Sequence, residues 1–223
     1  MIKAVVFDLD GTLLDTIEDI GETCNIVLKE LGHHPLDVKD YKIYVGKGVK
    51  HLVEKVFEHR QIDESSFNHF INRYYEVYQT QSSVFTKPYP GIMSLLDGLK
   101  NMEISINVLS NKPHGQVIDL MPKYFPKHDF DLVYGKKEEF STKPHPGSLR
   151  HMIKKLGLKK TEILYVGDTK TDMETALNAG VQSVGVLWGF RDETELVQAK
   201  ASYIIRKPKE LIQIIDNIHS ENK

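Results

Sequence analysis

Two aspartates near the start of the chain have the type and spacing of residues that do chemistry. The apolar residues 5–7 are followed by Asp8, Leu9, Asp10 and Gly11. In a strand, residues i and i+2 point to the same face, so the two carboxylates would repel each other unless a cation lies nearby or the chain turns away. Gly11 permits such a turn beside a ligand. The stretch therefore predicts a carboxylate site at the carboxyl end of a buried strand.

Two simpler interpretations of this stretch exist. An aspartate-rich turn could merely cap the helix that follows it. A calcium-binding EF-hand loop requires glycine at its sixth position and glutamate at its twelfth, whereas Gly11 is fourth from Asp8 and Asp19 is twelfth. Calcium-loop chemistry therefore fits poorly, and the choice between capping and catalysis depends on the rest of the chain.

Polar residues also end two later apolar stretches. Ser110 and Asn111 follow one at residues 104–109, and Asp168 follows another. The carboxyl ends of parallel strands share one edge of a sheet, so these residues are expected to meet the first pair of aspartates there. Asp172 lies four residues after Asp168, on the first turn of the next predicted helix, and can face the same way. Converging carboxylates require a divalent cation, and oxygen ligands without histidine or cysteine indicate Mg²⁺.

Groups that bind anions are expected near the same edge. They are the hydroxyls of Thr12 and Ser110, the amides at helix starts, and a lysine, Lys143. Carboxylates, Mg²⁺ and an anion site together are what phosphoryl transfer needs, because that reaction depends on positioning and on charge stabilisation.

The elements that must position these residues follow from hydrophobic periodicity. Beyond residue 91, apolar strands alternate with helices, which indicates a parallel sheet with right-handed crossovers. Between the first strand and the stiff connector at residues 87–91 the pattern is helical, clearest at residues 49–57 and 67–78. We therefore predict an α/β protein with a Rossmann-like, doubly wound parallel sheet and a helical cap inserted after the first strand. The predicted catalytic core is residues 1–14 and 88–223, and the predicted cap is residues 15–87.

Composition narrows the class of protein. The 223 residues carry a formal net charge of −2, which gives no support to a nucleic-acid partner. The single cysteine, Cys24, excludes an internal disulfide, and its place on a predicted helix favours a packing role. We find no apolar run of membrane-spanning length and no signal-peptide pattern. The expectation is a cytoplasmic protein without a membrane partner, as a monomer or a homodimer.

On these motifs the sequence resembles the haloacid dehalogenase-like hydrolase superfamily. The four motifs of the family occur in order along nearly the whole chain: residues 8–12, then Ser110, then Lys143, then Asp168 with Asp172. A helical insertion between the first motif and the second matches the family's first type of cap. Within the superfamily, the chain most resembles phosphoglycolate phosphatase-like members.

The resemblance implies a role for each motif residue. Asp8 would be the nucleophile that forms an aspartyl-phosphate intermediate, and Asp10 would protonate the leaving alcohol and then activate water. The residues expected to hold Mg²⁺ are Asp8, the backbone carbonyl of Asp10, Asp168 and Asp172. Those expected to hold the phosphoryl group are Thr12, Ser110, Asn111 and Lys143. The implied activity is Mg²⁺-dependent hydrolysis of a small phosphorylated metabolite such as phosphoglycolate, and an aspartate at position 10 favours this over dehalogenation.

Five further residues have a functional and a structural interpretation. Gly46 and Lys47 lie between helical cap segments, in a loop that could determine substrate specificity or be an ordinary turn. Thr16 could line the site or cap the first helix. His145 fits a loop residue better than a ligand, and Arg191, after a predicted strand end, could border the crevice.

Three other functions stay open on the sequence. Pyrophosphatases and sugar-phosphate mutases share the motifs. A catalytically silent metabolite-binding protein could also use the fold, although such proteins usually lose the nucleophile or its acid/base partner, and this chain has both Asp8 and Asp10.

Overall fold

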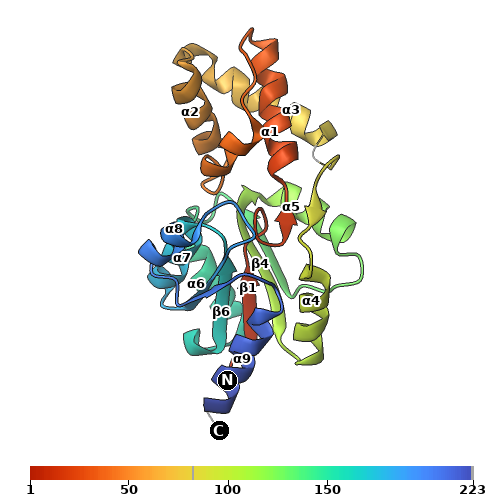
Figure 1. Ribbon diagram of the computed structural model, residues 1–223, viewed down its shortest axis with the longest axis vertical. Helices are drawn as coiled ribbons and strands as arrows, with labels where there is room; N and C mark the ends of the chain where they lie inside the picture. Colours follow the sequence, from red (N-terminus) through yellow and green to blue (C-terminus); the bar gives the residue numbers. More distant parts are fainter. Residues whose placement is uncertain (82, 222–223) are drawn as a thin grey trace. The chain divides into compact units, whose positions relative to one another are not determined.

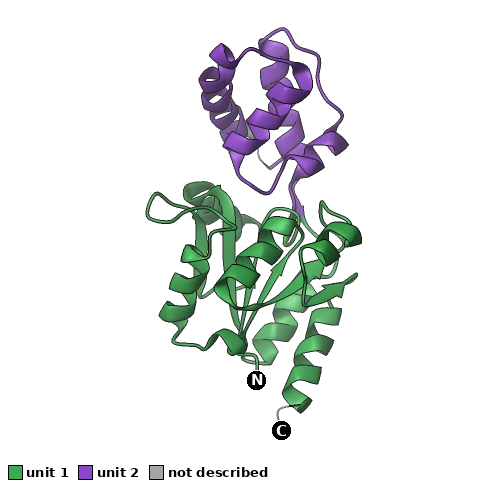
Figure 2. Ribbon diagram, turned by 90° about the vertical axis from the view of Figure 1, so that its left-hand side faces the viewer, with its two compact units in different colours: residues 1–14, 88–223 green, residues 15–87 purple. Residues whose placement is uncertain are grey.

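The computed structural model describes residues 1–81 and 83–221. Ser82, within the predicted cap, and residues 222–223 lie outside the described residues. The described chain divides into two compact units, shown in Figure 2: unit 1 is Met1–Leu14 with Pro88–Lys223, and unit 2 is Asp15–Lys87. Two short strands, β2 (Leu14–Asp15) and β3 (Lys87–Pro88), mark the points where the chain passes between the units.

Unit 1 is built on a parallel sheet. Among the described residues, six strands form it in the spatial order β5-β4-β1-β6-β7-β8, with every neighbouring pair parallel. The strands are β1 (Ala4–Phe7), β4 (Ser105–Pro113), β5 (Leu132–Lys136), β6 (Ile163–Gly167), β7 (Gln182–Val186) and β8 (Tyr203–Ile205). β1 lies between β4 and β6 (Figure 1), and the chain extends the sheet first on the β4 side and then on the β6 side. Open α/β sheets bind their ligands where the strand order reverses in this way.

Helices cover both faces of the sheet. They are α4 (Ile92–Asn101), α5 (His114–Tyr124), the 3₁₀ helix η3 (Lys160–Glu162), α6 (Gly147–Leu156), α7 (Lys170–Ala179), α8 (Glu193–Gln198) and α9 (Glu210–Glu221). In β1, Val5 and Phe7 pack into the core under α4, α5 and α9, whereas Ala4 and Val6 pack into the core under α6 and α7. A strand buried on both faces needs a continuous apolar run, which is what its sequence supplies. The predicted doubly wound α/β fold with a helical insertion is confirmed.

One strand differs from its predicted length. The sequence predicts that the strand before Ser110 stops at Leu109, but β4 continues to Pro113 with an irregular register between these two residues. The continuation pairs Pro113 with Lys136 of β5, so the edge of the sheet is still hydrogen-bonded at this point. Ser110, Asn111 and Lys112 therefore belong to the strand instead of following it.

Unit 2 is helical in its described residues. Its elements are α1 (Ile17–Glu30), the 3₁₀ helix η1 (Val38–Ile43), α2 (Val49–Arg60), the 3₁₀ helix η2 (Glu64–Ser66) and α3 (Phe67–Gln81). Aromatic rings fill its interior: Phe57 of α2 packs edge-on against Phe70 of α3 with centroids 5.5 Å apart. The side-chain amide of Asn25 both donates to and accepts from the backbone of Leu36, at 3.0 and 2.9 Å. This buried amide fixes the chain that leaves α1.

Across residues 1–81 and 83–221, the helices are too short or too polar to cross a membrane.

Candidate functional site

Asp8 begins the site, directly after β1. It is 5 % exposed, because β4 and β6 enclose the strand that carries it. Its Oδ1 accepts a hydrogen bond from the backbone amide of Leu9 at 2.7 Å. The same oxygen lies 2.9 Å from Nζ of Lys143, so the carboxylate already faces a cation inside the protein.

Two further aspartates join Asp8 after β6. Within the described chain, Asp8, Asp168 and Asp172 each offer a carboxylate oxygen, and these oxygens lie within 4.8 Å of one another. Asp172 stands in the first turn of α7, where its Oδ2 accepts from the backbone amide and the hydroxyl of Thr169 at 3.1 and 2.7 Å. This capping box fixes one face of the Asp172 carboxylate and leaves Oδ1 directed to Lys143.

Lys143 connects the carboxylates. Its Nζ lies 2.7 Å from Asp172 Oδ1 as well as 2.9 Å from Asp8 Oδ1, and its side chain is 2 % exposed. Nζ also donates to the hydroxyl of Tyr165 at 3.1 Å. The side chain of Asn111 holds the backbone of Lys143 from both sides, accepting from its amide at 2.8 Å and donating to its carbonyl at 3.1 Å. The lysine is thus positioned at its backbone as well as at its ammonium group.

Asp168 is held by the turn after β1 and by the loop after β7. Its Oδ1 accepts from the hydroxyl of Thr12, and its Oδ2 from the backbone amide of Phe190, both at 2.9 Å. Gly11, at φ +85°, and Gly189 come so close that a Cβ at either would lie 2.3 or 2.4 Å from an Asp168 atom. Only residues without a side chain allow this approach.

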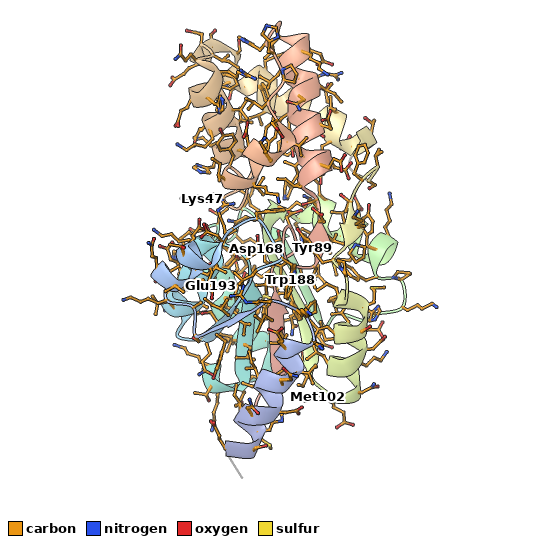
Figure 3. All side chains as sticks on the ribbon, viewed as in Figure 1. Lys47, Tyr89, Met102, Asp168, Trp188 and Glu193 are labelled. Carbon is orange, nitrogen blue, oxygen red and sulfur yellow. The ribbon has the colours of Figure 1, made fainter. Side chains whose placement is uncertain are left out.

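Trp188 completes the same edge of the sheet. Its indole Nε1 donates to the carbonyl of Thr12 at 2.9 Å, and Figure 3 labels it beside Asp168. The indole thereby holds the turn that presents Asp8 and Asp10, from a segment far away in the sequence.

Burial and crowding govern the ionisation of these groups. Burial raises the pKa of Asp8 well above its usual value, and the neighbouring Asp172 and Asp168 raise it further, while Lys143 opposes them. Burial and Asp172 likewise raise the pKa of Asp168, to about 7. For Lys143, burial alone would lower the pKa, but Asp172 and Asp8 outweigh it and raise the pKa well above the usual range. Lys143 is therefore charged at neutral pH, and it pairs with two of the three carboxylates, those of Asp8 and Asp172.

The donor set fits a divalent cation. It consists of buried carboxylate oxygens within 4.8 Å of one another, and burial together with the neighbouring carboxylates raises the pKa of Asp8 and Asp168. Hard oxygen ligands of this kind suit Mg²⁺. The cluster consists of three residues that the sequence predicts as metal ligands, Asp8, Asp168 and Asp172. The metal itself stays a prediction.

Asp10 is positioned separately. Its side chain is 12 % exposed, and its Oδ1 and Oδ2 lie 3.0 and 3.2 Å from Nζ of Lys112. Ser110, also at the end of β4, is buried, and its Oγ accepts from the backbone amide of Lys112 at 3.1 Å. The structure thus brings the predicted core residues to one edge of the sheet, each with an identified partner.

The candidate substrate-binding residues of unit 2 are not brought together in this way among the described residues. Gly46 and Lys47 form the turn between η1 and α2, with Gly46 at φ 121° and Lys47 exposed. Thr16 directly precedes α1, but its side chain makes no capping hydrogen bond, and its buried Oγ1 has no partner in residues 1–81 and 83–221. Their proposed contact with substrate stays a prediction.

Three residues outside the motifs are also placed. His145 accepts from the backbone amide of Gly147 at 3.1 Å, at the start of α6. Arg191 pairs with Glu195 at 3.1 Å. Its positive charge partly opposes the rise in the pKa of Asp168, so Arg191 borders the site. Cys24 is buried and its thiol is free, which agrees with packing.

Sequence reasoning missed several contributors. Tyr165 sits in β6, where it looked like one more apolar core residue, and Lys112 looked like part of a polar strand end without a defined partner. A faint signal existed for Lys112: it stands at i+2 from Ser110, which in a strand places both on one face. No signal marked Tyr165 or Trp188, because their hydrogen bonds reach residues distant in the chain.

The sequence matches a known family along most of its length. A family model described as haloacid dehalogenase-like hydrolase matches residues 5–186. A phosphoglycolate phosphatase of Neisseria gonorrhoeae is 33 % identical over 99 % of this chain and 94 % of its own. A phosphoglycolate phosphatase of Aquifex aeolicus is 30 % identical over 97 % of this chain and 98 % of its own.

Solved structures agree with the sequence match. A crystal structure from Haemophilus somnus, described as a predicted phosphoglycolate phosphatase, superposes with a TM-score of 0.90 at 25 % identity, covering 96 % of this chain and 98 % of that one.

Proposed function

This chain belongs to the haloacid dehalogenase-like hydrolase family, and on that premise we propose that it is a Mg²⁺-dependent phosphatase of a small phosphorylated metabolite, of the phosphoglycolate type. Asp8 and Asp10 are its catalytic residues. The observation that carries the proposal is the contact of one buried lysine with both Asp8 and Asp172, because it puts a nucleophile, a metal-ligand set and a cation for phosphoryl oxygens within a few ångströms.

The reaction divides into two displacements. In the first, an Asp8 oxygen attacks phosphorus, the bond from phosphorus to the ester oxygen breaks, and Asp10 gives its proton to the departing alcohol. In the second, Asp10 takes a proton from water, whose oxygen attacks the aspartyl-phosphate and releases inorganic phosphate and Asp8. Asp10 starts as a protonated carboxyl group, becomes a carboxylate in the first displacement, and regains its proton from water in the second.

The other site residues stabilise charge. Lys143 and the hydroxyl of Ser110 bind phosphoryl oxygens, where negative charge accumulates. Asn111 acts through Lys143, whose backbone it holds from both sides. Thr12 acts through Asp168, whose orientation it fixes. For Asn111 and Thr12 the resemblance to the family also implies direct contact with the phosphoryl group. We keep that contact in the proposal, in addition to these indirect roles.

Asp8, Asp168, Asp172 and the backbone carbonyl of Asp10 would hold the Mg²⁺ ion. When bound, it supplies the positive charge that lets the Asp8 carboxylate approach an anionic phosphoryl group.

Unit 2 is proposed as a cap that sets specificity. Support comes from its composition: its described interior holds packed aromatic rings, whereas Lys47, in the turn between η1 and α2, is exposed. A lysine there suits a substrate with a second anionic group, such as the carboxylate of phosphoglycolate. Small, doubly charged phosphate esters are therefore the proposed substrates.

The test is release of inorganic phosphate from a panel of phosphate compounds. The panel holds 2-phosphoglycolate, pyrophosphate, hexose phosphates and nucleotides, each with Mg²⁺ and with EDTA, and Asp8→Asn is the matched control. Release from phosphoglycolate that requires Mg²⁺ and Asp8 supports the proposal. Preference for pyrophosphate would correct the substrate, and interconversion of sugar phosphates without release would replace hydrolysis by a mutase reaction. Metabolite binding without turnover would indicate the silent binding protein.

A further inference from the structure

Asp8 and Asp10 are held by different lysines. Asp8 faces Lys143, which precedes α6, whereas Asp10 faces Lys112 at the end of β4. Within the described chain, the carboxylate cluster comprises Asp8, Asp168 and Asp172, and the side chain of Asp10 is not part of it. The two aspartates, two residues apart, are thus assigned to two separate electrostatic partners.

Lys112 is a deeply placed cation. Its side chain is 5 % exposed, although lysine is rarely buried unless it is paired. Its partner is Asp10: Nζ lies 3.0 Å from Oδ1 and 3.2 Å from Oδ2 of Asp10, so one ammonium group contacts both carboxylate oxygens. A charge-assisted contact to both oxygens restricts rotation of the carboxylate as well as its distance.

The backbone of Lys112 is fixed as well. Its amide donates to Ser110 Oγ at 3.1 Å, and the next residue, Pro113, pairs with Lys136 of β5. Asp10, in contrast, lies in the turn beside Gly11, where the chain has left β1. The lysine therefore comes from a strand end whose backbone is held by its own hydrogen bonds, and it can orient the aspartate.

An acid that protonates a leaving group must sit within hydrogen-bond reach of one oxygen. We infer that Lys112 is a positioning residue, which holds the carboxyl group of Asp10 in the orientation needed for proton transfer to the leaving alcohol. The inference rests on the proposed function, because it takes Asp10 as the acid. Lys112 itself is not assigned to phosphate binding, which distinguishes it from Lys143.

The experiment compares two leaving groups. An alkyl phosphate, here 2-phosphoglycolate, needs a proton on its departing oxygen, whereas p-nitrophenyl phosphate loses a stable phenolate without one. The parameter is kcat/KM, because it covers the steps up to departure of the leaving group. We expect Lys112→Met to lower kcat/KM about 10²-fold for the alkyl ester, the scale of a misplaced catalytic group. For the aryl ester the loss is expected to stay below about tenfold, since the proton transfer contributes little there.

Three further variants test whether the loss of activity on the alkyl ester arises from a misplaced Asp10. Lys112→Arg, which keeps the cation, is expected to recover part of the alkyl activity. In an Asp10→Asn background, Lys112→Met is expected to lower kcat/KM by less than about threefold more, because the lysine then has no acid to orient. Lys3→Met is the matched control: Lys3 pairs with Glu162 at 2.7 Å, at the amino ends of β1 and β6, the opposite edge of the same sheet.

Each contrary result has a distinct meaning. Equal losses for both esters, with weaker inhibition by inorganic phosphate, would show that Lys112 binds the phosphoryl group and would overturn the inference. Additive losses with Asp10→Asn would also overturn it. If Lys112→Met does not fold, Lys112→Gln takes its place, and failure of both would show a purely structural lysine. Absence of phosphate release by the wild type would instead reject the proposed function.

Discussion

Buried aspartates occur in both units, and their surroundings differ. In unit 1, Asp8 and Asp168 face another carboxylate, and burial together with that neighbour raises the pKa of each. In unit 2, Asp19 of α1 is 3 % exposed and accepts hydrogen bonds from the backbone amides of Val84, Phe85 and Thr86 at 2.8 to 3.3 Å.

This difference distinguishes buried aspartates with a proposed chemical role from a buried aspartate with a structural role. The donors around Asp19 belong to the fold itself, so this carboxylate stabilises the chain segment after α3. In unit 1, burial and the neighbouring carboxylates raise the pKa of Asp8 and Asp168, which disfavours their charged forms in the metal-free chain and is typical of functional sites. A buried carboxylate that faces other carboxylates therefore indicates a reaction site, whereas one surrounded by amides indicates a structural clamp. The predictions that follow test this distinction, beginning with the largest expected effect.

Asp8→Asn should abolish turnover. The change removes the nucleophile and one negative charge but keeps the shape of the side chain, so phosphate release should fall at least about 10⁴-fold. The free energy of unfolding should be unchanged or higher, because one member of a repulsive group is gone. Assays with 2-phosphoglycolate and thermal unfolding of the same preparation check both. Activity above about a tenth of wild type would contradict the prediction, since Asp8 would then not be the nucleophile.

The stability of the metal-free chain should fall as pH rises. The folded-state pKa of Asp168 is about 7, above the value of about 4 for an unfolded aspartate. Between these values the folded chain binds more protons than the unfolded chain, so its free energy of unfolding decreases through this window. Mg²⁺ binds the deprotonated carboxylates and should therefore raise the melting temperature more at about pH 8 than at about pH 5, by several degrees.

Melting curves with EDTA and with saturating Mg²⁺ check this pH dependence. Asp168→Asn is the matched variant, because it removes the group with the raised pKa. If Mg²⁺ stabilised the protein equally at both pH values, the carboxylates would not be the metal ligands.

Asp19→Asn should destabilise unit 2. The amide places an NH₂ group opposite backbone N–H donors, and loss of a buried charge-assisted hydrogen bond costs about 2 kcal/mol. Trp188, the single tryptophan, lies in unit 1, so its fluorescence reports that unit, whereas far-UV circular dichroism includes the helices of unit 2. Urea unfolding should show an earlier transition by dichroism and an unchanged one by fluorescence.

Glu18→Gln is the control for Asp19→Asn. Glu18 is also acidic in the first turn of α1, but it is exposed. Equal stability changes in the two variants would mean that charge near the helix start, and not the clamp on residues 84–86, is responsible.

Lys47→Ala should have the smallest effect. If the turn with Gly46 meets an anionic group of the substrate, its loss should raise KM about three- to tenfold with kcat unchanged. The neighbouring exposed Lys50 provides the control, as Lys50→Ala. Kinetics with 2-phosphoglycolate check both variants, and equal effects would assign the change to general charge instead of a specific contact.

The sequence predicts the sheet and its edge well, because β1 and β6 carry apolar runs that end in aspartates. The residues in these runs alternate between two cores, as Val5 and Val6 do, which is typical of a parallel sheet covered on both faces. The extent of β4 is not predictable in this way, since Ser110 and Asn111 are polar and their strand pairing depends on β5. The helix α8, six residues long, is too short to give a periodic signal.

The site residues are predictable as a set, but their partners are not. Spacing places Thr12 at the edge of the sheet, yet it does not reveal that the hydroxyl donates to Asp168, 156 positions away. The same holds for the contact of Lys112 with Asp10, 102 positions away. Long flexible side chains can reach several partners, and only the packed structure selects one.

The central place of β1 has a consequence for synthesis of the chain. β1 pairs with β4 and β6, whose paired residues begin at Ser105 and Ile163. A ribosome makes β1 first, but neither neighbour exists until much of the chain has followed, and such distant pairings form slowly. Residues 15–87, in contrast, are contiguous, so the helical unit can fold while β1 still waits for its partners. Asp8 is therefore translated long before the two strands that enclose it, and it reaches its final surroundings only after they have formed.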